Sequence, residues 1–163
     1  MTLVSRPVLA QTAGRCTSPS GFVSLNASTA GRGVTCSGNG PSYWATHTGP
    51  GQWPTGYKPD EPHATRFNDA FSNGSNVNYF TGNPTLLSAL GFTGSDKNNV
   101  ARYCSAALLN AAAGLTPVLT PAAVIGIWKE FASTSYGTFS PSSGVSWTAS
   151  EIDDYLTSTM VTL

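Results

Sequence analysis

The chain has 163 residues, of which only 10% are charged, and its formal net charge is zero. This length suits one domain whose core is large enough to fold without a metal or several disulfides. The low charge argues against a nucleic-acid partner, which needs a basic face, and against a basic membrane-binding patch. Since no apolar run approaches the ~20 residues that cross a bilayer, we expect no membrane span.

The first 14 residues contain two short apolar runs, MTLV and PVLA, separated by Arg6 and Pro7. Neither run is long enough for a helix, so both are predicted to be extended and to dock on a sheet edge or groove of the same subunit or a neighbour. PVLAQTA is also similar to the small-residue end of a secretory signal. We expect residues 1–14 to be an extended docking segment and residues 15–163 to be one globular domain. The expected assembly contacts are Met1, Leu3, Val4, Pro7, Val8 and Leu9.

Between residue 15 and about residue 60, the runs GFVSLNAS and RGVTCS alternate with turn signals and predict short β-like segments. The three cysteines are Cys16, Cys36 and Cys104, and none has the CxxC spacing of a zinc or redox site. Cysteines in Ser/Thr-rich loops favour a disulfide and an oxidising compartment. We expect Cys36 to pair with Cys104, on the apolar stripe of a helix, and keep a Cys16–Cys36 bridge as the alternative.

The stretch PSYWATHTGPGQWPTGYKPDEPH, residues 41–63, holds two Trp, two Tyr and both His. Its aromatic rings suit either a platform for a sugar or the core of a folded loop, and large rings in an irregular segment favour the core. The ligand-binding alternative uses Tyr43, Trp44, His47, Trp53 and Tyr57.

Catalytic motifs are absent from the sequence. His47 and His63, with Asp60, Glu61 and Asp69, lack the HExxH spacing of a metalloprotease. The chain also lacks a GxSxG elbow and a phosphate-binding loop. We expect neither an enzyme nor a cofactor or metal.

From residue 84 onward the pattern is helical. Asn83 and Pro84 predict a helix start, with LLSAL ending at Gly91 as a left-handed cap. Ser95 is expected to cap a helix over residues 96–112 that Gly114 closes, and its apolar positions recur at helical spacing. That buried stripe is Val100, Cys104, Ala107, Leu108 and Ala111.

Two further helices are predicted near the C-terminus. Thr120 and Pro121 open the first, and the TASE capping box, Thr148 to Glu151, opens the second. The expected apolar faces are Val124, Ile125, Trp128 and Phe131 on the first helix, and Ile152, Tyr155, Leu156 and Met160 on the second. The predicted fold class is therefore an α-rich α+β domain, with an irregular, β-like N-terminal part packed on about four helices.

PSYWATH, then QWP, then ARYCSAALLNAA is similar to a family of exported bacterial domains with a GYWKNHP-like motif followed by an AALLNA helix. The resemblance covers about residues 36–160 and is strongest at AALLNAA, Tyr43, Trp44 and His47. Ala45 and Thr46 replace the family's Lys and Asn, and Thr48 replaces its Pro. The resemblance implies export and a shared fold.

These observations favour a secreted or cell-surface structural subunit. It would form an extracellular, pilus-like filament or surface assembly and polymerise with copies of itself through the N-terminal segment. The alternative is a secreted module that uses the 41–63 loop, either to bind a carbohydrate or another surface ligand or to act as a hydrolase of unknown specificity. Surface glycans are its expected partners.

Overall fold

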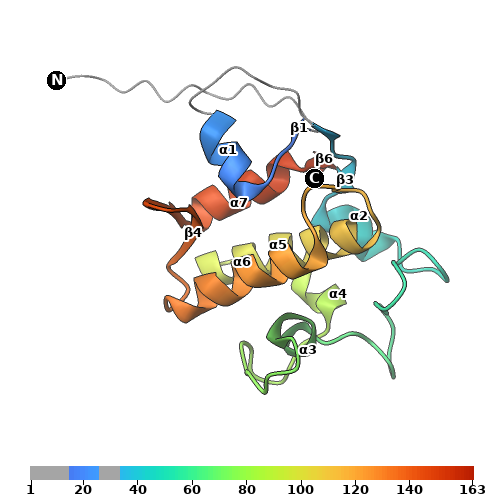
Figure 1. The fold of residues 1–163 in the computed structure, drawn as a ribbon. Coiled ribbons are helices and arrows are strands. Elements are labelled where there is room, and N and C mark those ends of the chain that lie inside the picture. Colours follow the sequence, from blue (N-terminus) through green and yellow to red (C-terminus); the bar gives the residue numbers. More distant parts are fainter. Residues whose placement is uncertain (1–14, 26–33) are drawn as a thin grey trace.

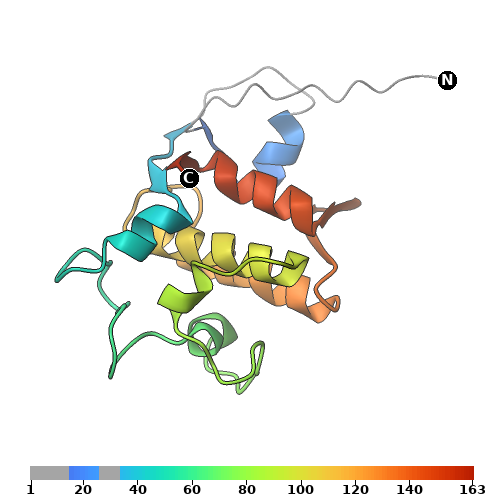
Figure 2. The same cartoon turned by 180° about the vertical axis from the view of Figure 1, so that it is seen from behind.

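Helices outnumber strands among the residues that the computed structural model describes, which are 15–25 and 34–163 (Figures 1 and 2). The helices are α1 (Pro19–Leu25), α2 (Pro41–Thr46), α3 (Phe67–Ser72), α4 (Leu86–Ala89), α5 (Asp96–Ala112), α6 (Pro121–Ser133) and α7 (Ala149–Ser158). The strands are β1 (Arg15–Cys16), β2 (Val34–Thr35), β3 (Gly38–Asn39), β4 (Thr138–Ser142), β5 (Val145–Thr148) and β6 (Met160–Thr162). They form three two-stranded sheets in the described residues. The prediction of an α-rich α+β fold is confirmed.

Helix α5 is the centre of the packing, since α2, α4, α6 and α7 all contact it. The Ser95 hydroxyl accepts a hydrogen bond from the Asn98 amide at its start, and Gly114 is left-handed (φ 74°) just beyond its end. Both ends therefore lie where capping predicts them. Its inner face is fully buried. The fully buried residues of the predicted stripe are Val100, Cys104, Ala107 and Leu108, whereas Ala111 is partly buried.

The N-terminal caps of α6 and α7 are also those predicted from the sequence. Thr120 caps α6 and Pro121 is its first residue, while Thr148 and Glu151 form the predicted capping box of α7. Two side chains differ from expectation. Ile125 is only partly buried because Ile127 fills the core-facing position of α6, and Met160 is buried in β6, beyond the end of α7.

Aromatic rings fill the space between α3, α6 and the loop before α4. The fully buried Trp128 ring is surrounded by others, with Phe67 edge-on at 4.9 Å and Tyr79 edge-on at 5.5 Å between ring centroids. Edge-to-face contacts of this kind are favourable beyond simple area burial. The loops are thus fixed to the helices by rings.

Three local predictions are wrong. The β-like run at residues 21–28 lies in α1 over its first five residues, because Phe22 packs edge-on against Trp147 and Tyr155; the remainder lies outside the described residues. The α4 cap is Thr85, whose hydroxyl accepts from the Ser88 amide, instead of Asn83. Gly91 is not left-handed, since Leu90 ends α4 in a right-handed conformation.

The two ends of the described chain are tied together. β1 pairs with β2, β3 pairs with β6, and the Tyr155 hydroxyl donates to the Thr17 carbonyl oxygen at 2.8 Å. The disulfide joins Cys16 and Cys36, so the expected Cys36–Cys104 pairing is wrong and the alternative is right. The antiparallel β1–β2 pair brings Cys16 and Cys36 together, whereas Cys104 is free and buried in the helical core.

Candidate functional site

The aromatic residues of the 41–63 loop are the first candidate site, and the structure uses its two indoles for packing. Trp44 is 3% exposed and Trp53 is 6% exposed. The Trp53 Nε1 donates to the Trp44 carbonyl oxygen at 3.1 Å, and the Trp44 Nε1 donates to the Asn110 Oδ1 at 2.9 Å. Neither indole therefore offers a free face to a sugar ring.

The other aromatic residues of this loop do not build a shared site. Tyr43 stacks on the imidazole of His47 with 3.8 Å between ring centroids, and the His47 Nδ1 lies 2.8 Å from the Tyr43 carbonyl oxygen. Tyr57 packs against the core, and burial raises the pKa of its hydroxyl. Each ring is thus occupied by a neighbour in the fold.

The acidic and histidine side chains named by the sequence are dispersed. Glu61 pairs with Arg66 at 2.7 Å, His63 is exposed, and Asp69 lies on α3 beside Asn83. In residues 15–25 and 34–163 no group of three or more His, Cys, Asp or Glu side chains could hold a metal ion. These residues do not converge on a reaction centre.

The AALLNAA segment contributes a buried amide that links distant parts of the chain. Asn110 is completely buried on α5, and its Nδ2 donates to the Asn39 carbonyl oxygen at 2.8 Å. Its Oδ1 accepts from the Asn39 amide at 2.8 Å and from the Trp44 indole. Asn110 therefore pairs with the edge of β3 that faces away from β6, which is called the outer edge below, and takes the place that a neighbouring strand would have there. Sequence reasoning missed this role, although a polar residue within an apolar helical stripe was its visible signal.

The C-terminal strand β6 covers the other edge of β3. This close approach requires glycine, because a Cβ at Gly38 would lie 2.6 Å from the Thr159 carbonyl oxygen and one at Gly40 would collide with the Thr162 carbonyl oxygen. Beyond β3, β6 has no other strand partner in the described part of the chain. Val161 on β6 is 47% exposed and Leu163 just beyond it is 66% exposed. The free edge of β6 with these two side chains is called the β6 edge below.

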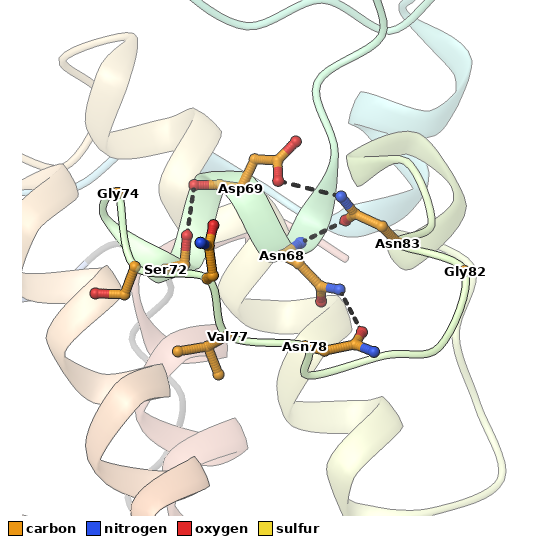
Figure 3. A pocket seen from close by; sticks show the side chains of 10 residues that line it. Asn68, Asp69, Ser72, Gly74, Val77, Asn78, Gly82 and Asn83 are labelled. Atoms are coloured by element: carbon orange, nitrogen blue, oxygen red, sulfur yellow. Dashed lines mark hydrogen bonds between the residues drawn. The ribbon is translucent and has the colours of Figure 1, made fainter.

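A second surface feature is a polar depression of about 490 Å³ beside α3 (Figure 3). Its walls come from α3 and from the loop that runs from residue 74 to residue 83. Its lining residues are Asn68, Asp69, Ser72, Gly74, Ser75, Asn76, Val77, Asn78, Gly82 and Asn83. Much of this lining comes from the Asn-rich stretch NGSNVNYFTGN, where no binding site was predicted from the sequence.

No protein-family model, curated protein or solved structure matches this chain. The likeness to exported domains with a GYWKNHP-like motif therefore remains an interpretation of the sequence. Trp44 belongs to PSYWATH and Asn110 to AALLNAA, so the hydrogen bond between them places both segments in the same core.

The N-terminal residues expected to drive assembly, Met1, Leu3, Val4, Pro7, Val8 and Leu9, lie outside the described residues. Among the described helices, none combines the length and hydrophobicity needed to traverse a membrane. The bridge between Cys16 and Cys36 is compatible with an extracellular location.

Proposed function

We propose that this protein is a non-enzymatic structural subunit of an extracellular filament or surface assembly, and that it polymerises through its N-terminal segment. The observation that carries the proposal is the β6 edge. Two of the three large apolar side chains exposed in the described residues, Val161 and Leu163, belong to it, and the third is Val77. An open edge with apolar side chains invites an added strand.

The N-terminal segment of a second copy is the partner that fits this edge. Residues 1–13 carry two short apolar runs, and an added strand would satisfy its backbone groups on β6 while alternate side chains contact Val161 and Leu163. Pro7 lies between the runs and would mark a break in pairing, because proline cannot donate to a ladder. Since Asn110 occupies the outer edge of β3, β6 is the edge of this sheet left to accept a strand.

Head-to-tail addition of this kind is heterologous and extends as a fibre unless the rotation between subunits closes a ring. The disulfide holds Cys16, at the root of the segment, to Cys36, which lies two positions before β3. The segment therefore starts near the β6 edge of its own subunit, so a closed monomer competes with the polymer. We expect assembly to increase with protein concentration.

Deletion of residues 1–13 tests the proposal directly. The truncated protein should remain folded and monomeric, because the buried hydrophobic residues of the described chain run from Cys16 to Met160, and it should no longer polymerise. Electron microscopy and analytical ultracentrifugation of both forms over a range of concentrations measure this. Filaments from the truncated protein, or none from the full-length protein at any concentration, would leave the secreted binding module or hydrolase as the better reading.

A second test places a charge on β6, the strand to which the added strand would pair. Val161→Lys should abolish polymerisation, because edge lysines block strand addition. Val77→Lys is the control, since Val77 is also an exposed valine (41%) but lies on the loop beside α3. Equal polymerisation by the two variants would exclude the β6 edge as the acceptor.

A further inference from the structure

A hydrogen-bond network centred on Asn68 holds the walls of the polar depression in place (Figure 3). The Asn68 Nδ2 donates to the Asn78 Oδ1 and to the Phe80 carbonyl oxygen, both at 2.9 Å. The Asn68 Oδ1 accepts from the backbone N–H of Phe80 at 3.1 Å. The backbone N–H of Asn68 donates to the Asn83 Oδ1 at 3.0 Å. The Asn83 Nδ2 then donates to the Asp69 Oδ1 at 3.1 Å. Asn68 is only 5% exposed, so this framework is fixed before any ligand arrives.

The same network leaves hydrogen-bonding groups unused at the surface of the depression. Within the described residues, the Asn78 Nδ2, the second carboxylate oxygen of Asp69 and the whole amide of Asn76 have no side-chain or backbone partner. Together they provide donors from two amides and acceptors from one carboxylate and one amide. A ligand for this surface must therefore both donate and accept.

The lining excludes several ligand classes. It has no Lys or Arg to neutralise a phosphate, and no aromatic or large aliphatic surface for a lipid. Its single carboxylate is a poor match for a divalent cation, which prefers several oxygen ligands of high charge. Val77 adds one apolar contact, 41% exposed.

We propose that this depression binds a neutral carbohydrate. Sugar hydroxyls act as donor and acceptor at once, so they match a carboxylate and amides held at fixed positions, and the C–H groups of a sugar ring can rest on Val77. The volume of about 490 Å³ lies within the usual range for small-molecule sites. The structure thus points to a sugar site beside α3, in place of the aromatic 41–63 loop.

This site goes beyond the proposed structural role and does not depend on it. Helix α3 and the β6 edge lie at opposite ends of the molecule in both views (Figures 1 and 2). Subunits joined through β6 would leave the depression open on every copy, so weak single sites would act together on a glycan surface.

The test is a titration of the full-length protein with glucose, galactose, mannose and N-acetylglucosamine, followed by NMR of the asparagine side-chain amides. A ligand this small should bind with a Kd of about 1 mM. The amide signals of Asn76 and Asn78 should shift with at least one of the sugars. Asp69→Ala and Asn76→Ala should each weaken binding about fivefold to tenfold, the loss expected for one or two hydrogen bonds.

Asp154→Ala is the matched control, since Asp154 is an exposed carboxylate on α7, away from the depression, and should leave the Kd unchanged. Asn76→Ala removes no hydrogen bond from the network, so a loss of binding there cannot reflect misfolding. The proposal is overturned if none of the sugars shifts these amides at about 20 mM, twentyfold above that Kd. It is also overturned if both variants bind as the unaltered protein does, or if binding requires added calcium.

Discussion

Asp153 on α7 carries a carboxylate oxygen that is buried without a hydrogen-bond partner among the described residues. Burial raises the pKa of Asp153 to about 7; the guanidinium of Arg102 opposes this shift, while Asp154 and Asp96 add to it. The Nε of Arg102 is itself buried and unpaired in the described part of the chain. The charges of Asp153 and Arg102 thus influence each other through space, and among the described residues no hydrogen bond or ion pair joins the two side chains.

This raised pKa predicts how stability depends on pH. The folded chain holds a proton on Asp153 up to about pH 7, whereas the unfolded chain releases it near its ordinary pKa of about 4. The protonated Asp153 carboxyl group therefore contributes its full share to the free energy of unfolding below about pH 4. That share is lost as the pH rises to about 7. Asp153→Asn should remove this loss and be more stable than the unaltered protein at pH 8, as judged by urea midpoints across this range.

Asp60→Asn serves as the control, because Asp60 is an exposed loop carboxylate. It should keep the pH profile of the unaltered protein. Parallel profiles for Asp153→Asn and the unaltered protein would show that this carboxyl group does not titrate as its burial implies.

At the scale of elements, Asn110 lets a helix act as the missing neighbour of a strand. Its amide group makes both backbone hydrogen bonds along the outer edge of β3 and also holds the Trp44 indole. One side chain thereby joins α5, β3 and α2.

Asn110→Ala should destabilise the protein by about 3–5 kcal/mol, because the buried Trp44 indole N–H and the partly buried N–H and carbonyl groups of Asn39 would all lose their hydrogen bonds. Asn99→Ala, on the same helix and without a side-chain partner among the described residues, should change stability by less than about 0.5 kcal/mol. Urea unfolding monitored by tryptophan fluorescence measures both. Equal stabilities would mean that the bonds of Asn110 contribute nothing net.

The elements that could be predicted from the sequence are those with local signals. Ser95, Thr120 and Thr148 each precede a helix and accept from an amide in its first turn, so capping rules locate α5, α6 and α7. Helix α1 could not be predicted, because the packing of Phe22 on Trp147 and Tyr155 overrides the β-like appearance of its sequence.

The candidate sites were harder to predict because they depend on particular side-chain and strand contacts, some of them between distant parts of the chain. β6 meets β3 across most of the chain, and Asn39 and Asn110 are 71 positions apart. The polar depression depends on how Asn68 holds the loop that follows α3. Neither arrangement has a periodic pattern that a sequence could reveal.

For the whole molecule, the disulfide fastens the N-terminal part to the sheet that β6 completes. Cys16 and Cys36 are separated by 20 positions, and closing a loop of that size stabilises the folded state by about 3 kcal/mol. The double variant Cys16→Ser, Cys36→Ser should lose about that much stability in urea unfolding under non-reducing conditions. Retention of full stability would mean that the bridge constrains the unfolded chain very little.

Counting thiols tests the pairing itself. The native protein should present no reactive thiol, the unreduced protein in denaturant one, and the reduced protein all three. Peptide mapping should identify the single thiol as Cys104. A free Cys16 or Cys36 in the unreduced protein would contradict the pairing.

The burial of Cys104 has a consequence for how long the Cys16–Cys36 bridge keeps its pairing. Burial raises the pKa of its thiol well above the ordinary value, so the folded protein holds it in an unreactive form. Once α5 opens, that thiol can form a thiolate and attack the Cys16–Cys36 bridge of its own or a neighbouring chain. Exchange takes roughly seconds to hours, which is longer than a small domain usually needs to refold, so a single opening seldom scrambles the bridge. The useful lifetime of the bridge is therefore set by the small fraction of molecules in which α5 is open, so a variant that destabilises α5 should shorten it even when the chain still folds.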